Sequence, residues 1–409
     1  MRLAGGSKDA EDELTANLQA VDADDVQRMA EQPTLINLVN LIILEAIKER
    51  ASDIHVEPFE KALSVKYRVD GLLRQRNSPP KALQPAITSR IKIMAGMNIA
   101  ERYVPQDGHI TLRFEGRKVD IRVSTVPTIY GESVVMRLLD KEAIKLDLVA
   151  LGFRTPDQVN IQRLIDLPHG MVLVTGPTGS GKTTTLYAAL TKLYDPSLKI
   201  ITIEDPVEYE LPGVNQMPVN PKRGLTFATG LRSILRQDPD VIMVGEIRDR
   251  ETADIAIRAA LTGHLVFSTL HTNDAPSAIT RLTDMGVENY LITSSVVAVL
   301  AQRLVRLICG NCRVDDGTRL APDGRTVPAF RGSGCDVCAG SGYRGRMGIF
   351  EMMELNDELR SRIMANEDAS RLTECARKYG MRSLREDGWE KVATGMTTAD
   401  EVMRVTQEF

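Results

Sequence analysis

The octapeptide GPTGSGKT, residues 176–183, stands between an apolar run and a helix-forming run. The apolar run, residues 171–175, is typical of a buried parallel strand, and the helix-forming run ends at Asp195–Pro196. Glycines between a strand and a helix N-terminus let backbone N–H groups surround an anion. A chance glycine-rich loop is the alternative, but it does not explain the flanking strand and helix. The stretch therefore predicts a site for a nucleoside triphosphate.

Two side chains of this loop have predicted chemical roles. Lys182 can reach the β- and γ-phosphates, and the hydroxyl of Thr183 can bind Mg²⁺. ATP and Mg²⁺ are therefore the expected ligands. The residues expected to hold the nucleotide are Gly176, Pro177, Thr178, Gly179, Ser180, Gly181, Lys182, Thr183 and Thr184.

Length and composition bound the class of protein. The 409 residues leave room for two or three domains, and 43% hydrophobic and 26% charged residues are ordinary for a globular chain. A net charge of −4 and 4% aromatic residues disfavour nucleic acid as a partner. The start lacks the apolar segment of a signal peptide, and the apolar stretch at 35–47 is too short and polar for direct membrane insertion. We expect a cytoplasmic protein that reaches a membrane only through partners.

The order of predicted elements divides the chain into a small α+β domain and a larger α/β domain with a mostly parallel sheet. A two-residue hairpin turn is expected at Asp70–Gly71, and a second turn at Glu115–Gly116. The expected segments are a flexible acidic segment at 1–32, the α+β domain at 33–139, a linker at 140–153, the α/β domain at 154–308, a cysteine module at 309–340 and a helical region at 341–409.

Four cysteines form two closely spaced pairs, Cys309 with Cys312 and Cys335 with Cys338. This pattern favours a tetrahedral Zn²⁺ site. Because all four ligands would be thiolates, no position stays open for water, and the zinc is expected to be structural. Four free thiols or a redox pair are the alternatives, whereas disulfides suit a cytosolic chain poorly. The fifth cysteine, Cys375, is expected in a core.

Acidic residues follow two of the predicted parallel strands, which end directly before Glu204 and before Gly245. The carboxyl ends of such strands share one edge of the sheet with the phosphate loop. We assign Glu246 to orienting or deprotonating the attacking water, with Glu204 as the second candidate. Because Gly245 takes the place of the usual metal-binding Asp, Glu204 or Asp205 is expected to hold the water shell of the metal. Ordinary solvated acids are the competing interpretation.

One histidine and four arginines complete the predicted site. His271 follows the strand at 265–270 and is the candidate for sensing the γ-phosphate, whereas His264 at the other end of that strand is as well explained by a structural role. Cations must balance charge on the transferred phosphoryl group. Surface salt bridges are the alternative for each arginine. The candidates are Arg232 and Arg236, four apart on one helix face, and Arg68 and Arg74, which flank the hairpin turn and could be donated across a domain or subunit boundary.

These segments together closely resemble the secretion and pilus assembly ATPases, and within them the type II secretion ATPases. The paired cysteines and the segments below cover nearly all of residues 33–407, a combination far more specific than the phosphate loop alone. The matching segments are SDIHVEPFEK, YRVDGLLR, ERYVPQDGHI, RVSTVPTIYGESVVMRLL, GPTGSGKTTTLYAAL, ITIEDPVEY, LRSILRQDPDVIMVGEIRD, LTGHLVFSTLHTND, YRGRMGIFEM and EVMRVT.

The resemblance implies a hexamer in which nucleotide lies between a PAS-like small domain and a RecA-like P-loop domain, with Arg68 and Arg74 reaching the nucleotide. It also implies partners in an inner-membrane platform of the GspL and GspF type, and a role in pseudopilus assembly for type II protein secretion. Members carry a further N-terminal docking domain, whereas residues 1–32 precede the small domain here.

Several functions remain open at this point. A motor that hydrolyses ATP and closes about the 140–153 linker is favoured, and a type IV pilus extension ATPase is the nearest alternative. A RecA-like nucleic-acid translocase is an alternative from another class, although the acidic balance disfavours it. A scaffold that binds nucleotide with little hydrolysis is less consistent with the presence of both Lys182 and Glu246.

Overall fold

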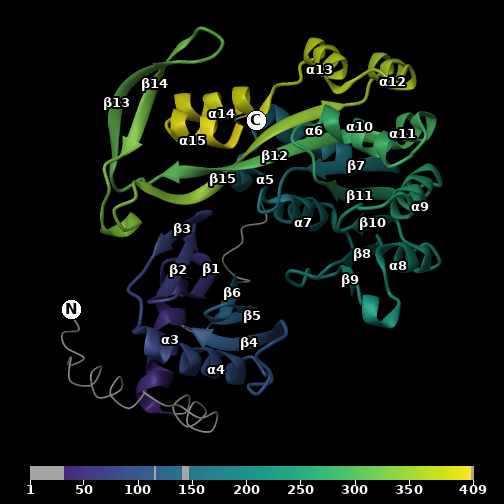
Figure 1. Ribbon diagram of the computed structural model, residues 1–409. Coiled ribbons are helices and arrows are strands. Elements are labelled where there is room, and N and C mark those ends of the chain that lie inside the picture. The colour runs from purple at the N-terminus through teal and green to yellow at the C-terminus, as the bar shows by residue number, and fades with distance from the viewer. Residues whose placement is uncertain (1–31, 115–116, 141–146, 407–409) are drawn as a thin grey trace. The chain divides into compact units, whose positions relative to one another are not determined.

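The computed structural model describes residues 32–114, 117–140 and 147–406. The chain divides into two compact units, Met1–Ile144 and Lys145–Phe409 (Figure 1). The predicted turn at Glu115–Gly116, residues 1–31 of the predicted acidic segment and residues 141–146 of the predicted linker lie outside the described residues.

The first unit is a six-stranded antiparallel sheet with helices against one face. Helices α3 (Pro33–Lys48) and α4 (Gln84–Met94), the latter preceded by a 3-10 turn at Lys81–Leu83, share one apolar core with the sheet. The strands are β1 (Ala51–Pro58), β2 (Leu63–Val69), β3 (Leu72–Gln75), β4 (Gln106–Phe114), β5 (Arg117–Thr128) and β6 (Gly131–Asp140), in the order β3-β2-β1-β6-β5-β4.

Buried and more exposed side chains alternate along the strands of this sheet. In β2, Val65 and Tyr67 are buried on the helix side, and the Tyr67 hydroxyl donates a hydrogen bond of 2.7 Å to the carbonyl of Ile42 in α3. The hairpin between β2 and β3 closes through Asp70 and Gly71, whose φ angles of 50° and 87° are those of a type I′ turn. The predicted two-residue turn is confirmed.

The second unit contains a seven-stranded sheet. Six neighbouring strands are parallel, and β15 runs antiparallel to β12 at one edge. The predicted strands at 171–175, 199–203, 241–244 and 265–270 are confirmed, to within one residue at each end. The strands are β7 (Gly170–Thr175), β8 (Ile200–Glu204), β9 (Asn215–Pro218), β10 (Val241–Val244), β11 (Leu265–Leu270), β12 (Val296–Ile308) and β15 (Tyr343–Glu354), in the order β15-β12-β7-β11-β10-β8-β9.

Helices cover both faces of this sheet because its strands are apolar on both sides. In β7, Met171 and Leu173 join one core, whereas Val172 and Val174 join another. Helices α5 (Leu148–Leu151), α6 (Thr155–Ile165) and α7 (Lys182–Leu193) contribute to the core of Val172 and Val174. The opposite core takes α8 (Phe227–Ile234), α9 (Arg250–Leu261), α10 (Pro276–Asp284) and α11 (Asn289–Ser295).

A two-stranded ribbon and four helices follow β12. The ribbon, β13 (Arg313–Leu320) and β14 (Thr326–Gly332), projects beyond the ends of β12 and β15 (Figure 1). After β15 come α12 (Asp357–Met364), α13 (Ala369–Lys378), α14 (Leu384–Ala393) and α15 (Ala399–Thr406), so the expected helical region is present and is opened by a strand. Cys375 is buried in the core, as predicted. Among the described residues, no helix has the length and apolar character needed to cross a membrane.

Candidate functional site

The predicted phosphate loop connects β7 to α7. Lys182 is the first residue of α7, and Gly181 caps the helix with a φ of 90°. Gly176 has a φ of 150°, and a Cβ there would lie 2.5 Å from the carbonyl oxygen of Gln302 in β12. Glycine is therefore required for the conformation and for the close approach to β12. Thr183 and Thr184 follow in the first turn of α7 and are half-buried.

Two polar groups of the loop fit an anionic ligand. The Lys182 ammonium donates to the carbonyl oxygens of Gly176 at 2.7 Å and Pro177 at 3.1 Å. Burial lowers the pKa of Lys182 to about 8. The positive charge of Arg303 also lowers this pKa, whereas the negative charge of Glu246 raises it. The hydroxyl of Ser180 is buried and has no hydrogen-bond partner in the described part of the chain. Phosphate oxygens would satisfy both groups.

Glu246 lies at the same edge of the sheet. It follows β10, and its carboxylate forms an ion pair with Arg248 and lies 3.2 Å from Nε2 of His271, which follows β11. Burial opposes ionisation of Glu246, but Arg248 and His271 outweigh it, so its pKa is lowered. A lowered pKa makes Glu246 a weak proton acceptor, which suits orienting water through a hydrogen bond better than removing its proton.

Glu204 occupies a different environment. Its side chain is 3% exposed and accepts hydrogen bonds from the hydroxyl of Tyr187, from Thr202 Oγ1 at 2.6 Å and from Gln216 Nε2 at 3.1 Å. These neutral donors on α7, β8 and β9 fix the carboxylate inside the protein. Asp205, the next residue, is exposed, and its charge acts with that of Glu246 to raise the pKa of Arg248. Asp205 is thus the accessible acid at the end of β8.

Of the two arginines predicted on one helix face in the larger unit, Arg232 lies on the surface of α8, whereas Arg236 lies two residues beyond the end of this helix, because α8 ends at Ile234. Arg232 forms an ion pair of 2.6 Å with Glu251 of α9, and Arg236 donates to the carbonyl oxygen of Arg232 at 2.8 Å. Among the described residues, no hydrogen bond or ion pair joins either arginine to Lys182 or Glu246. In the described residues these arginines therefore make no direct polar contact with Lys182 or Glu246.

In the smaller unit, Arg68 belongs to a row of cations across the sheet. Asp53 of β1 is 6% exposed and lies 3.5 Å from Arg68 Nε, and it accepts a hydrogen bond of 3.1 Å from Arg137 Nε. Strand register places Arg122 of β5 opposite Arg137. We name Arg68, Arg137 and Arg122 the arginine row. Because cross-strand partners share a face, Arg74, which is opposite Tyr67, lies on the other face of the sheet.

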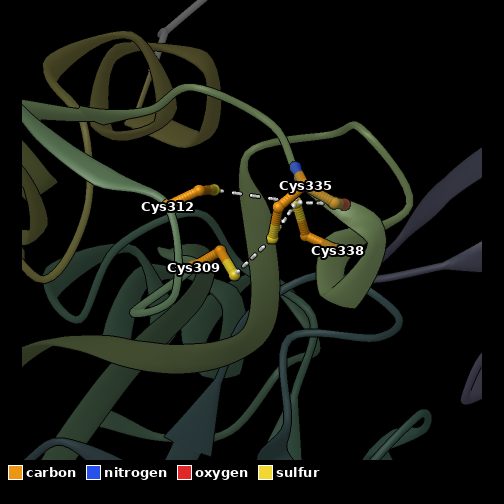
Figure 2. Close-up of side chains that lie close together, drawn as sticks. All are labelled: Cys309, Cys312, Cys335 and Cys338. Atoms are coloured by element: carbon orange, nitrogen blue, oxygen red, sulfur yellow. Dashed lines mark hydrogen bonds between the residues drawn. The ribbon is translucent and has the colours of Figure 1, made fainter.

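The four paired cysteines converge, as Figure 2 shows. Their sulfur atoms all lie within 4.8 Å of one another. The closest pairs are Cys335–Cys338 at 3.7 Å, Cys312–Cys338 at 3.8 Å and Cys309–Cys335 at 3.9 Å. A tetrahedron with Zn–S bonds of about 2.3 Å has edges of about 3.8 Å. The cluster therefore fits a zinc module.

Backbone N–H groups donate hydrogen bonds to one of these sulfurs. The N–H groups of Cys335 and Gly342 each point to Cys338 Sγ at 3.2 Å. Although burial opposes ionisation, these hydrogen bonds hold the pKa of Cys338 below its ordinary value. A thiolate is the form that binds metal, so the backbone favours the ligand state. No other group of metal-binding residues is found in the described ranges.

A family model described as "Type II/IV secretion system protein" matches residues 28–404. The chain belongs to this family. It is 55% identical to "Type II secretion system protein HxcR" of Pseudomonas aeruginosa over 91% of this chain and 78% of that protein. It is 51% identical to "Type II secretion system ATPase E" of Vibrio cholerae over 94% of this chain and 78% of that protein.

Solved structures support the fold class. The pilus retraction motor PilT with bound ADP has a TM-score of 0.63 and 28% identity, covering 90% of this chain and 96% of that one. The Legionella pneumophila ATPase DotB has a TM-score of 0.67 and 23% identity, covering 90% of this chain and 95% of that one, which shows the fold alone. The expected fold, a RecA-like P-loop domain with a smaller PAS-like domain, a four-cysteine module and a C-terminal helical region, is confirmed.

Sequence reasoning missed residues on β12 that support the phosphate loop. Gln302 accepts a hydrogen bond of 2.7 Å from Thr185 of α7, and Arg303 donates to the carbonyl oxygen of Asn273 at 2.9 Å. Both β12 residues lie next to Gly176. No local motif connects positions so far apart in the chain. The only available indication was the apolar character of the run from 296 to 308, which does not reveal its neighbours in the sheet.

Proposed function

We propose that this protein hydrolyses ATP. The observation that carries the proposal is the phosphate loop, in which the half-buried ammonium of Lys182 interacts electrostatically with Glu246 at the carboxyl edge of the parallel sheet. Membership in a family with relatives named as ATPases supports the same reaction. ATP would bind with its phosphates in the loop between β7 and α7.

The residues at this edge of the sheet would have different roles. Lys182 and the backbone N–H groups of the loop bind and orient the phosphates, and Glu246 orients the attacking water, held in place by Arg248 and His271. Mg²⁺, when bound, would supply positive charge at the phosphate oxygens, and in this proposal the half-buried Thr183 and the exposed Asp205 would hold it or its water shell. Through its contact with Glu246, His271 would respond to the γ-phosphate.

We further propose that the active form is a hexamer. The arginine row carries three guanidinium groups on one sheet face, where Asp53 forms ion pairs with Arg68 and Arg137. Cations of this kind stabilise charge on a transferred phosphoryl group when donated from another domain or subunit. Arg68, Arg122 and Arg137 are the better candidates, and Arg74 remains a second one on the opposite face.

The cellular role that we propose is to power pseudopilus assembly for type II secretion. The support is the 50–55% identity to proteins named as type II secretion components in several bacteria. In this role the protein would be cytoplasmic and attach to inner-membrane platform proteins of the GspL and GspF type, and ATP turnover would open and close its two units. A pilus extension role would be indicated instead if the protein restored pili but not secretion in the respective deletion strains.

The test is specific ATPase activity against protein concentration. A steep rise is expected as the ring assembles, and Lys182→Ala should remove turnover at every concentration. Arg137→Gln should abolish the rise, whereas Arg113→Gln, a change of another exposed strand arginine, should preserve it. Absence of turnover in the wild type would refute the ATPase proposal, and concentration-independent activity would refute the donated arginine. Salt-sensitive stimulation by DNA would favour the translocase.

A further inference from the structure

The segment His271–Ala275, directly after β11, begins at the nucleotide edge. His271 Nε2 lies 3.2 Å from Glu246, and the backbone N–H of Thr272 donates to Thr175 Oγ1 at 2.8 Å. Thr175 is the last residue of β7 and precedes the first glycine of the phosphate loop. Displacement of either the loop or Glu246 would therefore act on this segment first.

The same segment is tied at its other end to strands beyond β7. Asn273 accepts a hydrogen bond of 2.9 Å from Arg303 of β12 through its carbonyl oxygen. The backbone N–H of Ala275 donates to Glu351 Oε1 of β15 at 2.7 Å. Ala275 is also the residue directly before α10. The segment therefore connects the nucleotide edge with the edge strand β15.

Glu351 joins two helix N-termini. Its side chain is 6% exposed, and its carboxylate accepts the N–H of Ala275 before α10 at 2.7 Å. The N–H of Leu384, the first residue of α14, is a second donor that favours the charged form of the carboxylate. Helix N-termini favour an anion, which compensates part of the cost of burying this group. Burial nevertheless raises the pKa of Glu351 to about 7, with Asp274 adding to the effect and the two N–H groups opposing it.

Space is available for movement at this junction. Glu351 lines a cavity of about 700 Å³ whose walls also include Pro177 of the phosphate loop and the start of α14 from Ser383 to Glu386. Downstream, α14 is held to β15 through Asp387, which accepts the N–H of Phe350 at 2.9 Å, and through Lys391, which donates to the carbonyl oxygen of Gly348 at 2.7 Å.

We propose that Glu351 is a positioning residue that transmits the nucleotide state of the phosphate loop, through the segment His271–Ala275, to α14 and the C-terminal helices. This inference rests on the proposed function, because it requires nucleotide to bind at the loop. It assigns the coupling to one carboxylate that accepts N–H groups from both sides. The test therefore measures the coupling between the loop and α14 directly.

Leu384→Pro removes the N–H that faces Glu351, together with a side chain that is buried in the core. Proline lacks the N–H that Glu351 accepts and is tolerated at the first position of a helix. The preceding residue, Ser383, has φ −72° and ψ 159°, which a residue before proline readily adopts. Leu384→Ala is the matched control, since it also shortens the side chain but keeps the N–H. Glu351→Leu and Glu351→Gln form a second pair, because glutamine keeps an acceptor oxygen for these N–H groups and leucine keeps none.

The measurement is hydrogen exchange of the full chain with and without a non-hydrolysable ATP analogue. Nucleotide should change exchange in the loop, in residues 271–275 and in residues 384–393 of the wild type, Leu384→Ala and Glu351→Gln. In Leu384→Pro and Glu351→Leu the change at 384–393 should disappear while the loop still responds. In turnover, kcat should fall about fivefold or more at a KM within about twofold, the scale of a coupling energy between sites.

Two results would overturn the inference. The first is a wild type whose loop responds to nucleotide while residues 384–393 do not. The second is a nucleotide response of residues 384–393 in Leu384→Pro or Glu351→Leu that equals the wild-type response. If the loop itself gave no response in the wild type, the proposed function would fall, and this inference with it.

Discussion

ATP binding should weaken as pH rises through the pKa of Lys182. In the nucleotide-free protein, burial lowers this pKa to about 8, so the ammonium begins to lose its proton within the accessible pH range. Bound phosphates would favour the charged form and raise the pKa again. At high pH, ATP binding is therefore accompanied by proton uptake on Lys182. Affinity for ATP decreases as the pH rises above the pKa of Lys182 in the nucleotide-free protein, and it is highest below that pKa.

The magnitude follows from the fraction of charged Lys182. With a pKa of about 8, roughly nine-tenths of the side chains are protonated at pH 7 and about one-tenth at pH 9. If only the protonated form binds, the apparent dissociation constant rises about tenfold over this range, equivalent to about 1.4 kcal/mol. The second ionisation of a phosphate group, near pH 6, is largely complete before this range begins.

The assay is equilibrium titration with a non-hydrolysable ATP analogue at constant ionic strength, repeated from pH 6.5 to 9.5 in buffers of different ionisation enthalpy so that proton uptake is measured directly. Lys182→Arg should bind more weakly but show little pH dependence, because arginine stays charged. Glu246→Gln should move the midpoint to lower pH, since the carboxylate raises the pKa of Lys182. A pH-independent wild type, or an unshifted midpoint in Glu246→Gln, would refute the reasoning.

Three further outcomes are expected. Removing metal with a chelator should unfold residues 309–338 and leave the smaller unit intact by hydrogen exchange, since structural zinc contributes about 10–16 kcal/mol to small modules; purified protein without stoichiometric metal would end this claim. Asp387→Ala removes the buried carboxylate that pairs with Lys391 and Arg154. The free energy of unfolding of the larger unit, measured in urea titrations, should therefore fall by about 3–5 kcal/mol, and a loss below about 1 kcal/mol would contradict this expectation. Glu204→Gln should reduce kcat by about tenfold at most, because its partners are neutral donors, and a loss as large as that of Glu246→Gln would give Glu204 a direct role.

Features with local causes were predictable from the sequence. The glycines of the phosphate loop, the apolar run of β7 and the Asp70–Gly71 turn each depend on a few adjacent residues, and all appear where the pattern places them. The cysteine pairs were equally informative, because a two-residue gap within each pair already fixes half of a tetrahedral site. Local sequence therefore sufficed for the loop, the hairpin and the metal cluster.

Features that depend on strand pairing were not predictable. Nothing near Gly176 in sequence indicates that β12 packs against it, or that β15 joins β12 at the edge of the sheet. The hairpin gives a second example. Within one strand, residues an even number of positions apart share a face, but Arg68 and Arg74 are on two different strands. The two-residue turn pairs Arg68 with Leu73 and Tyr67 with Arg74, so the two arginines lie on opposite faces of the sheet.

The burial of individual acids also required the structure. Glu204 and Asp205 are adjacent at the end of β8, and a strand pattern alone does not say which one faces solvent. Tyr187 and Gln216, from α7 and β9, hold Glu204 inside and leave Asp205 exposed. The choice is made by side chains that come from other elements of the sheet, not by residues next to the pair.

The most direct test of the assignment of water orientation to Glu246 is single-turnover hydrolysis by Glu246→Gln, measured together with ATP binding. The account predicts retained binding at pH 7 and a fall in the rate of the chemical step of about 10²-fold or more, the scale expected when a reacting water loses the group that positions it. A variant that binds ATP and cleaves it at the wild-type rate would contradict the account.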